Sequence, residues 1–505
     1  MYLKLKGFAP DADTSEPGVL TDCDLLIPTI RGFESLPGDT FAAVATYSSS
    51  VIVSAISATL LDGSFRLIAG TAGSASAATS SMIELTSGST LNRDGAGGPY
   101  TASSAARWTF AQYGSAILAA QKGTQIIFSD TSSATGSATF TAISGAPQAV
   151  AIVSVLNFIV AFNTIDVLFG DSPNRWWNCA TGNFQSWVPN VATQATSGLL
   201  TDINGAIVGG AAVGSDLVAF SADKAVQGRY VGAPSVWDWK VIAGEGLGAY
   251  SHHSIVSVEG VGLLWPGQDN FYLFDGARAT PIGTNRVAAF FQEDLNISTA
   301  GRIVGFHEQA KWRVFWWYPS IAGGLTDGAL DRFICFNYRS RSWGFGRKTV
   351  GFPLETKAVG LTWDDVGDTY TTWDDLPSAP YDSAFMPSGS PTPSFFSSAG
   401  AVVNMNGVGS TSYFTTGGLG TDARISTFSR ARPRFQKVPT SGTLEHSYAD
   451  QLGIAWAVSQ ATEAVLTRGA FDRTHAARWH QLKPTFVGDM ELVGLDIELK
   501  PESLE

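Results

Sequence analysis

The sequence has little charge, and this shortage already excludes two broad classes of protein. Asp, Glu, Lys and Arg make up 15% of the 505 residues, whereas about 25% is typical of soluble domains. The chain also carries 30 Phe, 15 Trp and 13 Tyr, and this aromatic content with low charge excludes disorder over most of its length. The scarcity of Lys, Glu and Leu in heptads excludes a coiled coil.

Basic residues are the scarcer of the two charge types. The chain has 32 Lys and Arg against 44 Asp and Glu, which gives a net charge of −12. Proteins that grip nucleic acid usually present a basic face, because phosphate contacts supply the affinity that does not depend on sequence. This composition argues against tight binding of nucleic acid, but it is compatible with a pore through which nucleic acid slides.

Cysteine is rare, and its spacing carries no metal-site or redox motif. The three cysteines are Cys23, Cys179 and Cys335. No two of them have the C-x-x-C spacing or another spacing typical of metal ligands. We therefore expect three buried, small apolar side chains in a reducing compartment.

Two long stretches contain no charged residue, at 40–61 and 131–165. Either is long enough to cross a bilayer as a helix. The first is rich in Ser and Thr, the second contains Gly145, Pro147 and Asn157, and both alternate as strands do. The apolar run at the N-terminus is too short for a signal peptide. The sequence therefore predicts no integral membrane segment.

Residues 40–165 contain very few charges for a free surface. The charged residues there are Asp62, Arg66, Glu84, Arg93, Asp94, Arg107, Lys122 and Asp130. A free monomer usually carries more surface charge than this. We therefore predict a subunit that lies within an assembly.

What the chain does contain is a repeated strand–turn–strand unit that ends in Phe. The unit recurs at residues 115–128, 157–169, 206–220, 261–274 and 312–336, with looser copies at 51–68 and 393–404. The Phe residues at 128, 169, 220, 274 and 336 are separated by 41, 51, 54 and 62 residues. A period of about 40 to 60 residues is typical of β-propeller blades.

The repeat predicts an all-β fold, a β-propeller of six to eight blades with seven units, and a small additional β domain at the C-terminus. The alternative is a protein of several β-sandwiches, because isolated hairpins can build either. We divide the chain into an N-terminal extended segment (1–38), the main propeller blades (39–350), a loop-rich insertion with the last blade (351–420) and the C-terminal β domain (421–505). The third segment is rich in Asp, Pro and Ser, which are turn and loop residues.

No catalytic motif stands out, so we predict no enzyme, no cofactor and no catalytic, cofactor-binding or metal-binding residue. The glycine-rich stretch 244–248 lacks the third glycine of a dinucleotide loop and lies among predicted strands. The stretch 257–265 approaches the Asp box of sialidase-type propellers but has Glu259 in place of Asp and its glycines at other offsets. Both are interpreted as structural.

Three groups of residues could either bind a metal ion or have a structural role. His252 and His253 are adjacent, so on a strand they would face opposite sides and make poor joint ligands. His475 and His480 could meet, but no carboxylate pairs with them. Six Asp residues between 361 and 385 offer the oxygen ligands that Ca²⁺ prefers, or each caps a turn beside a packed Trp. The structural role is the favoured interpretation for all three groups.

Three parts of the chain resemble the tail nozzle, or tail-hub, proteins of short-tailed bacteriophages. The stretches are Gly7–Asp13 with Pro17–Asp22 and Pro28–Phe33, then Gly244–Gly248 with 254–256, 267–276 and 281–283, and finally Arg478–His480 with Gly494–Ile497. The resemblance implies a β-propeller subunit, six copies in a ring below the portal and adaptor proteins, and a distal DNA channel that closes in the filled virion and opens for ejection. It implies no catalytic residues.

The resemblance also implies partners and a location. The partners are further copies of the chain, portal and adaptor proteins, tail fibres or spikes, and double-stranded DNA that passes through the lumen without specific binding. The location is the phage tail, after synthesis in the bacterial cytoplasm. The alternatives are a propeller that binds glycans, a tail-associated polysaccharide depolymerase, and a soluble binding propeller outside any virion.

Overall fold

The computed structural model describes residues 1–42, 46–72, 78–86, 89–103, 105–132, 137–203, 205–323, 329–359, 388–452, 455–458 and 464–501. These residues are almost entirely β-strand. The described part holds one α-helix, α1 (Ala288–Asp294), and three short 3₁₀ helices, η1 (His252–Ser254), η2 (Ile297–Arg302) and η3 (Gln309–Lys311). The prediction of an all-β propeller is confirmed, and no helix in the described ranges is long and apolar enough to span a membrane.

Seven four-stranded antiparallel units, numbered here as blades, follow one another along the chain. Blade 1 contains β7 (Ile52–Thr59), β8 (Phe65–Thr71), β10 (Met82–Glu84) and β11 (Leu91–Asn92), with β9 (Thr79–Ser80) and β12 (Tyr100–Thr101) paired beside it. Blade 2 contains β13 (Thr109–Tyr113), β14 (Ala116–Gln121), β15 (Thr124–Asp130) and β16 (Thr141–Ala142). Blade 3 contains β17 (Gln148–Val155), β18 (Phe158–Asp166), β19 (Gly170–Asn178) and β20 (Thr196–Leu199).

The remaining blades have the same order. Blade 4 contains β21 (Gly209–Val213), β22 (Asp216–Phe220), β23 (Ala225–Gly232) and β24 (Val236–Val241). Blade 5 contains β25 (Val256–Val258), β26 (Gly262–Pro266), β27 (Phe271–Phe274) and β28 (Ala279–Pro281). Blade 6 contains β29 (Val304–Glu308), β30 (Arg313–Tyr318), β31 (Leu330–Asn337) and β32 (Ser342–Val350). Blade 7 contains β33 (Phe352–Val359), β34 (Ser388–Phe396), β35 (Val402–Gly407) and the N-terminal strand β6 (Gly38–Phe41).

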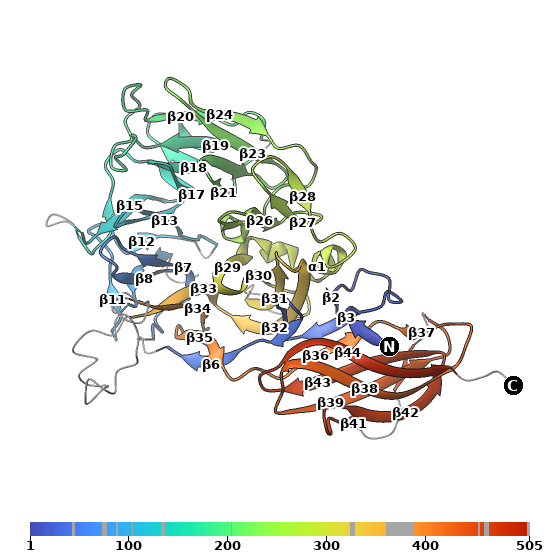
Figure 1. Cartoon of the computed structure of the whole chain (residues 1–505). Helices are drawn as coiled ribbons and strands as arrows, with labels where there is room; N and C mark the ends of the chain where they lie inside the picture. The colour runs from blue at the N-terminus through green and yellow to red at the C-terminus, as the bar shows by residue number, and fades with distance from the viewer. Residues whose placement is uncertain are drawn as a thin grey trace.

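The first strands of consecutive blades contact one another and close a ring. β7 contacts β13, and the contacts continue through β17, β21, β25 and β29 to β33, which returns to β7 (Figure 1). Every residue of β14 and of β30 is buried, because each blade packs neighbours against both of its faces. This explains why the strands read as continuous apolar runs.

Both ends of the chain share a β-sandwich beside the propeller (Figure 1). One sheet contains β1 (Tyr2–Lys4), β4 (Leu26–Pro28), β5 (Phe33–Ser35), β38 (Ser426–Lys437), β42 (Phe471–Ala477) and β44 (Glu491–Pro501). The other contains β2 (Gly7–Phe8), β3 (Val19–Asp24), β36 (Ser412–Thr416), β37 (Leu419–Gly420), β39 (Ser441–Ala449), β40 (Ala457–Val458), β41 (Ala464–Val465) and β43 (Trp479–Val487). Thus strands from the predicted segments 1–38 and 421–505 pair in the same two sheets.

Six of the seven predicted hairpins are present as two adjacent strands, and one is wrong. The sequence predicts two strands separated by a short polar turn for residues 157–169. Instead β18 runs unbroken to Asp166, and Phe169 lies in the turn that follows it. Asn163 has a φ of +55° at a register shift between β18 and β19. A β-bulge therefore occupies the position that the sequence predicts as a turn.

Candidate functional site

The centre of the propeller is crossed by the connector between blades 4 and 5. Ser251 begins the short helix η1 with a capping box, in which its side chain accepts from the Ser254 backbone N–H. Ser251 also donates to the Ile303 carbonyl at 2.9 Å, and the Trp316 indole donates to the Ser254 carbonyl at 3.0 Å. These bonds fix the connector to blade 6, and its two histidines line cavities between the blades.

His252 and His253 lie in this 3₁₀ turn rather than on a strand, so the expectation of opposite faces is wrong. Their ring centroids are 5.5 Å apart. His252 Nδ1 accepts from the Gly210 N–H at 3.4 Å, and His253 Nε2 lies 2.9 Å from the Trp108 carbonyl. Burial lowers the pKa of His252 to about 4 and, with the charges of His252 and Arg107, that of His253 to about 3. Both rings are therefore neutral near pH 7. They line the neighbouring cavities and form hydrogen bonds with the backbone.

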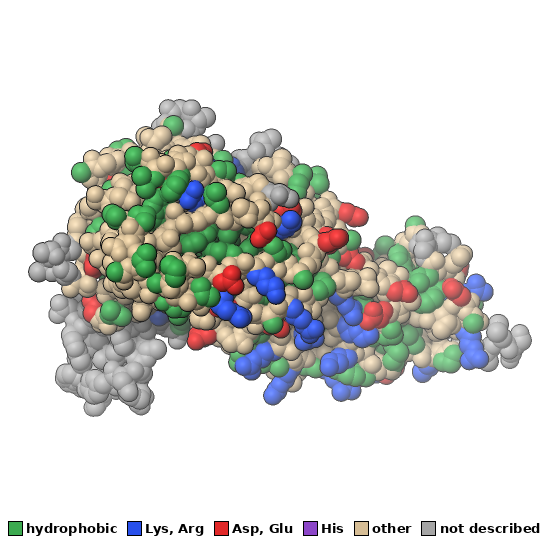
Figure 2. All heavy atoms as spheres, turned by 90° about the horizontal axis from the view of Figure 1, so that it is seen from above, with side chains coloured by type: hydrophobic (Ala, Val, Ile, Leu, Met, Phe, Trp, Pro, Cys, Tyr) green, Lys and Arg blue, Asp and Glu red, His purple; other side chains and the backbone are tan. Residues whose placement is uncertain are grey.

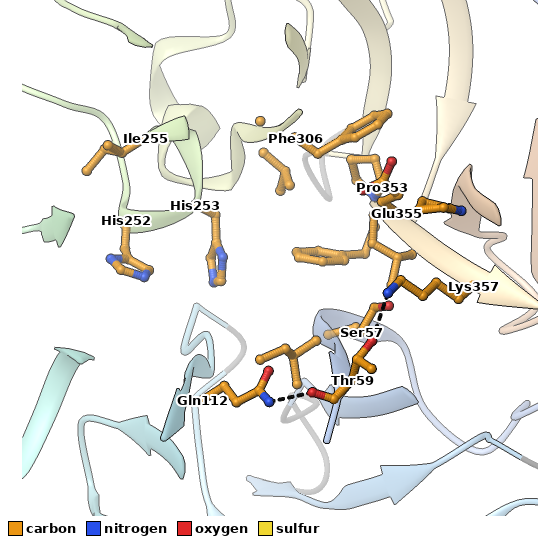
Figure 3. Close-up of a pocket in the computed structure, with 17 residues that line it drawn as sticks. Ser57, Thr59, Gln112, His252, His253, Ile255, Phe306, Pro353, Glu355 and Lys357 are labelled. Carbon is orange, nitrogen blue, oxygen red and sulfur yellow. Dashed lines mark hydrogen bonds between the residues drawn. The ribbon is translucent and has the colours of Figure 1, made fainter. Parts of the chain in front are cut away.

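Two cavities meet at these histidines. The first, which we call the strand cavity, has a volume of about 540 Å³ and is bounded by β7, β29 and β33 (Figure 3). Lys357 Nζ donates to Thr59 Oγ1 at 2.9 Å, and Gln112 donates to the Thr59 carbonyl at 2.7 Å. Burial raises the pKa of Glu355. Glu355 is the one carboxylate among the described lining residues, so the paired carboxylates of a glycosidase are not assembled there.

The second cavity also has a volume of about 540 Å³, and Lys122, Val150 and Tyr250 are among the residues that line it. The η1 connector also separates the strand cavity from the second cavity, because His252 and His253 line both.

Blades 3 and 4 expose an unusual share of large apolar side chains. In the described part of the chain 25 such side chains are exposed, and ten of them lie between residues 148 and 241. They are Leu156, Val167, Leu168, Phe169, Val188, Val191, Leu199, Tyr230, Val231 and Val241. Three of them are consecutive at the tip of the β18–β19 hairpin. Figure 2 shows few charged side chains over most of the propeller and more of them toward the sandwich.

The other sequence candidates have structural roles or lie outside the described residues. A Cβ on Gly248 would lie 1.9 Å from the Ala222 carbonyl oxygen, so this glycine permits close backbone packing rather than phosphate binding. The Asp-rich stretch 361–385 is outside the described residues. Within them, no group of three His, Cys, Asp or Glu side chains is placed to hold a metal ion. The three cysteines are free and buried, as predicted.

His475 and His480 are brought together through a third histidine that the sequence did not single out. His446 Nε2 lies 3.0 Å from His480 Nδ1, and the His446 and His475 ring centroids are 5.6 Å apart. The pKa of His446 is lowered to about 3 by burial and by the unfavourable interaction of its charged form with His480, His475 and Arg473. The cluster forms part of the sandwich core, because the Phe428 ring lies 4.9 Å from that of His446.

Several residues from the stretches that carry the resemblance lie where the sandwich meets the propeller. Phe8 stacks on Phe345 of blade 6 and meets Phe290 of α1 edge-on, with centroids 5.1 Å away in both cases. The Asp11 carboxylate accepts from the backbone N–H groups of Ala289 and Phe290 at 2.8 and 2.9 Å. One core cluster runs through Phe8, Phe271 of blade 5 and Ile497 of the sandwich. The propeller and the sandwich are therefore joined by a continuous hydrophobic core.

No protein-family model and no curated protein sequence matches the chain. Among solved structures, BamB from Moraxella catarrhalis is similar with a TM-score of 0.37 and 10% identity, over 80% of this chain and 99% of that one. YCF48 from Cyanidioschyzon merolae is similar with a TM-score of 0.36 and 10% identity, over 73% of this chain and 98% of the YCF48 chain. PorZ, a surface component of the Porphyromonas gingivalis type-IX secretion system, is similar with a TM-score of 0.34 and 10% identity, over 63% of this chain and 43% of the PorZ chain. The propeller assignment rests on the sheets of this chain.

Proposed function

We propose that the chain is a structural, non-enzymatic subunit of the tail nozzle of a short-tailed bacteriophage. Copies of it, six in the family that it resembles, form a ring around the distal DNA channel. The ring closes that channel in the filled virion and opens for ejection of the genome. Portal and adaptor proteins on one side, and fibres or spikes around it, are the partners that this role requires.

The exposed apolar hairpin of blade 3 is the observation that carries the assembly part of this proposal. Val167 is fully exposed and Leu168 is 68% exposed at the tip of the β18–β19 hairpin. Clusters of exposed apolar side chains are typical of surfaces that a protein partner covers. Burial of this surface against another copy would also account for the low charge of the propeller blades.

The acidic balance of the chain supports a ring through which DNA slides. The acidic net charge of −12 suits a conduit wall, because a surface that does not attract phosphate lets DNA slide. A rigid subunit also suits a ring that bears pressure, and here the shared core fixes the sandwich to the propeller.

Gold-antibody labelling of purified virus particles from the source lysate, viewed by electron microscopy, tests the proposal. We expect gold at the tip of the tail. Clean particles, with an antibody shown to bind the native protein, would overturn the nozzle role. Cleavage of host polysaccharide by the purified chain, if lost on substitution of Glu355→Gln, would instead favour the depolymerase alternative.

A further inference from the structure

The strand cavity contains a carboxylate oxygen that no described residue satisfies. Glu355 lies on β33 and lines the cavity. Its Oε1 atom is buried and accepts no hydrogen bond within the described part of the chain. A buried acceptor without a donor is costly, because burial removes the hydrogen bonds that it makes to water. A ligand that brings an N–H or O–H group to this oxygen would therefore be stabilised.

Lys357 lies beside Glu355 but does not pair with this oxygen. Side chains two residues apart on a strand face the same side, and both residues line the cavity (Figure 3). Lys357 Nζ donates to Thr59 Oγ1 at 2.9 Å, which leaves two of its three N–H groups outside the described hydrogen bonds. One wall of the cavity therefore offers an unused acceptor and unused donors next to each other.

The charges of this wall balance. Glu355 and Lys357 are the two charged side chains among the described lining residues. His252 and His253 lie across the cavity from them (Figure 3) and add no charge near pH 7, because burial lowers the pKa of both. A ligand with one net charge would be attracted by one of the two charged side chains and repelled by the other. A ligand with one positive and one negative group can pair with both.

The rest of the wall is mostly apolar and suits a compact hydrocarbon group. The apolar side chains that line it are Ile56, Ile255, Val304, Phe306, Phe352 and Leu354. Removal of a ligand's apolar surface from water against these side chains favours binding. The volume of about 540 Å³ lies within the range of about 300 to 1,000 Å³ that is usual for small-molecule sites.

We propose that the strand cavity binds a free amino acid with an apolar side chain. Its ammonium group donates to Glu355, its carboxylate accepts from Lys357, and its side chain packs against the apolar wall. The cavity lies between the inner strands of the propeller, away from the blade 3 hairpin that is assigned to ring assembly. The proposal does not rest on the tail-nozzle role.

Isothermal titration of the full chain with leucine tests this proposal. Isoamylamine has the same hydrocarbon group without the carboxylate, isocaproate has it without the ammonium group, and glucose is a neutral ligand of another class. We expect leucine to bind with a Kd below about 5 mM and both single-charge analogues to bind at least about tenfold more weakly. We expect no binding of glucose.

Substitutions then assign the two charged groups of the ligand. Glu355→Gln, which keeps the shape of the side chain but not its charge, should weaken leucine about tenfold. Lys357→Met should weaken leucine to a similar extent but should not weaken isoamylamine, which has no carboxylate for Lys357 to hold. Glu259→Gln, at an exposed position between β25 and β26, is the matched control and should bind leucine as the parent does.

The proposal is wrong if leucine produces no heat of binding up to about 50 mM, or if Glu355→Gln binds leucine as tightly as the parent. Binding of glucose in preference to leucine would also overturn it and would favour a glycan ligand. If Glu355→Gln does not fold, the parent protein decides the matter. Isocaproate lacks the group that Glu355 is proposed to hold, so equal affinities for leucine and isocaproate would reject the site.

Discussion

Phe41, close to the N-terminus, pairs with Val403 across the outer edge of blade 7. The propeller is thus closed by a strand from the opposite end of the chain, and its last blade has no complete edge without that strand. The same N-terminal region then enters the sandwich, where Tyr2 pairs with Asp496. Closure of the ring and assembly of the sandwich are therefore mechanically linked through fewer than fifty residues.

A proline at Thr40 should weaken this closure. The backbone N–H of Gly38 donates to the carbonyl of Val408, directly after β35, and that of Ala42 donates to the carbonyl of Val402 in β35, at 3.0 Å each. Because alternate residues of an edge strand face the same neighbour, the Thr40 N–H also points toward β35, and Thr40→Pro removes it. We expect the free energy of unfolding to fall by about 1 to 3 kcal/mol, measured by urea denaturation. Phe41→Pro is the control, since its N–H points away from β35 and proline is tolerated there. Equal midpoints for the two variants would contradict the closure role.

Loss of Arg313 should destabilise the junction between blade 6 and the sandwich. Arg313 is 1% exposed and lies between two carboxylates, 2.7 Å from Glu308 and 2.8 Å from Glu34. Burial alone would raise the pKa of Glu34, but Arg313 and Lys311 lower it overall. Arg313→Met leaves both carboxylates buried without this partner, which typically costs about 3 to 5 kcal/mol. Arg430→Met, which breaks an exposed pair with Asp472, should leave the denaturation midpoint unchanged. A similar small effect at Arg313 would show that the carboxylates are solvated there.

Acid should destabilise the sandwich through His446. Its pKa falls from about 6.5 in an unfolded chain to about 3 in the fold, because it is buried beside His480, His475 and Arg473. Between about pH 6.5 and pH 3 this histidine binds a proton in the unfolded chain but not in the folded protein. The free energy of unfolding therefore decreases as the pH falls through this range. At pH 5 this group alone accounts for about 2 kcal/mol.

The pH dependence is checked by denaturation of the parent and of His446→Gln at pH 7 and pH 5. The variant keeps a hydrogen-bond donor near His480 Nδ1 but cannot titrate, so its loss of stability between the two pH values should be smaller. The buried His252 and His253, whose pKa values are also lowered from about 6.5, reduce the stability of both proteins in the same pH range. An identical loss in parent and variant would assign the acid sensitivity to those histidines instead.

A charge at the blade 3 hairpin should reduce self-association. Leu168→Asp places a carboxylate on the exposed tip, where it cannot be buried against another subunit without a large desolvation cost. We expect a smaller species in light scattering after size exclusion, with an unchanged melting temperature. Val438→Asp, at an exposed position after β38 in the sandwich, should keep the parent's size. A parent that is already monomeric at every concentration tested, or equal dissociation in both variants, would exclude this surface from assembly.

The sequence was sufficient for the fold class because apolar runs, Gly turns and Phe ends recur in it. It was not sufficient to place the hairpins within blades. The copies at 51–68 and 206–220 are first and second strands, whereas those at 115–128 and 261–274 are second and third. The irregular spacing of the Phe residues has this origin. Strand position within a blade depends on which neighbour supplies the hydrogen bonds, and no local pattern records that.

The sequence also did not predict that residues 38–41 close blade 7 or that His446 joins His475 and His480, and the reason is similar. Residues 38–41 form a short strand that is exposed at three of its four positions, so no apolar alternation marks it. His446 is separated from His475 and His480 by a long stretch of chain, and the three meet only because β39 pairs with β43 and β38 with β42. Contacts that long-range pairing creates leave no motif in sequence spacing.

The N-terminal strand of blade 7 also constrains the order of events during synthesis. Blades 1 to 6 leave the ribosome in sequence, yet β6 has no partner until β35 has emerged. Until then the chain carries β6 as an unpaired edge, and such edges favour pairing with other chains. Final folding is therefore expected after most of the polypeptide has been made, so that a truncated product would be prone to aggregate rather than to enter an assembly.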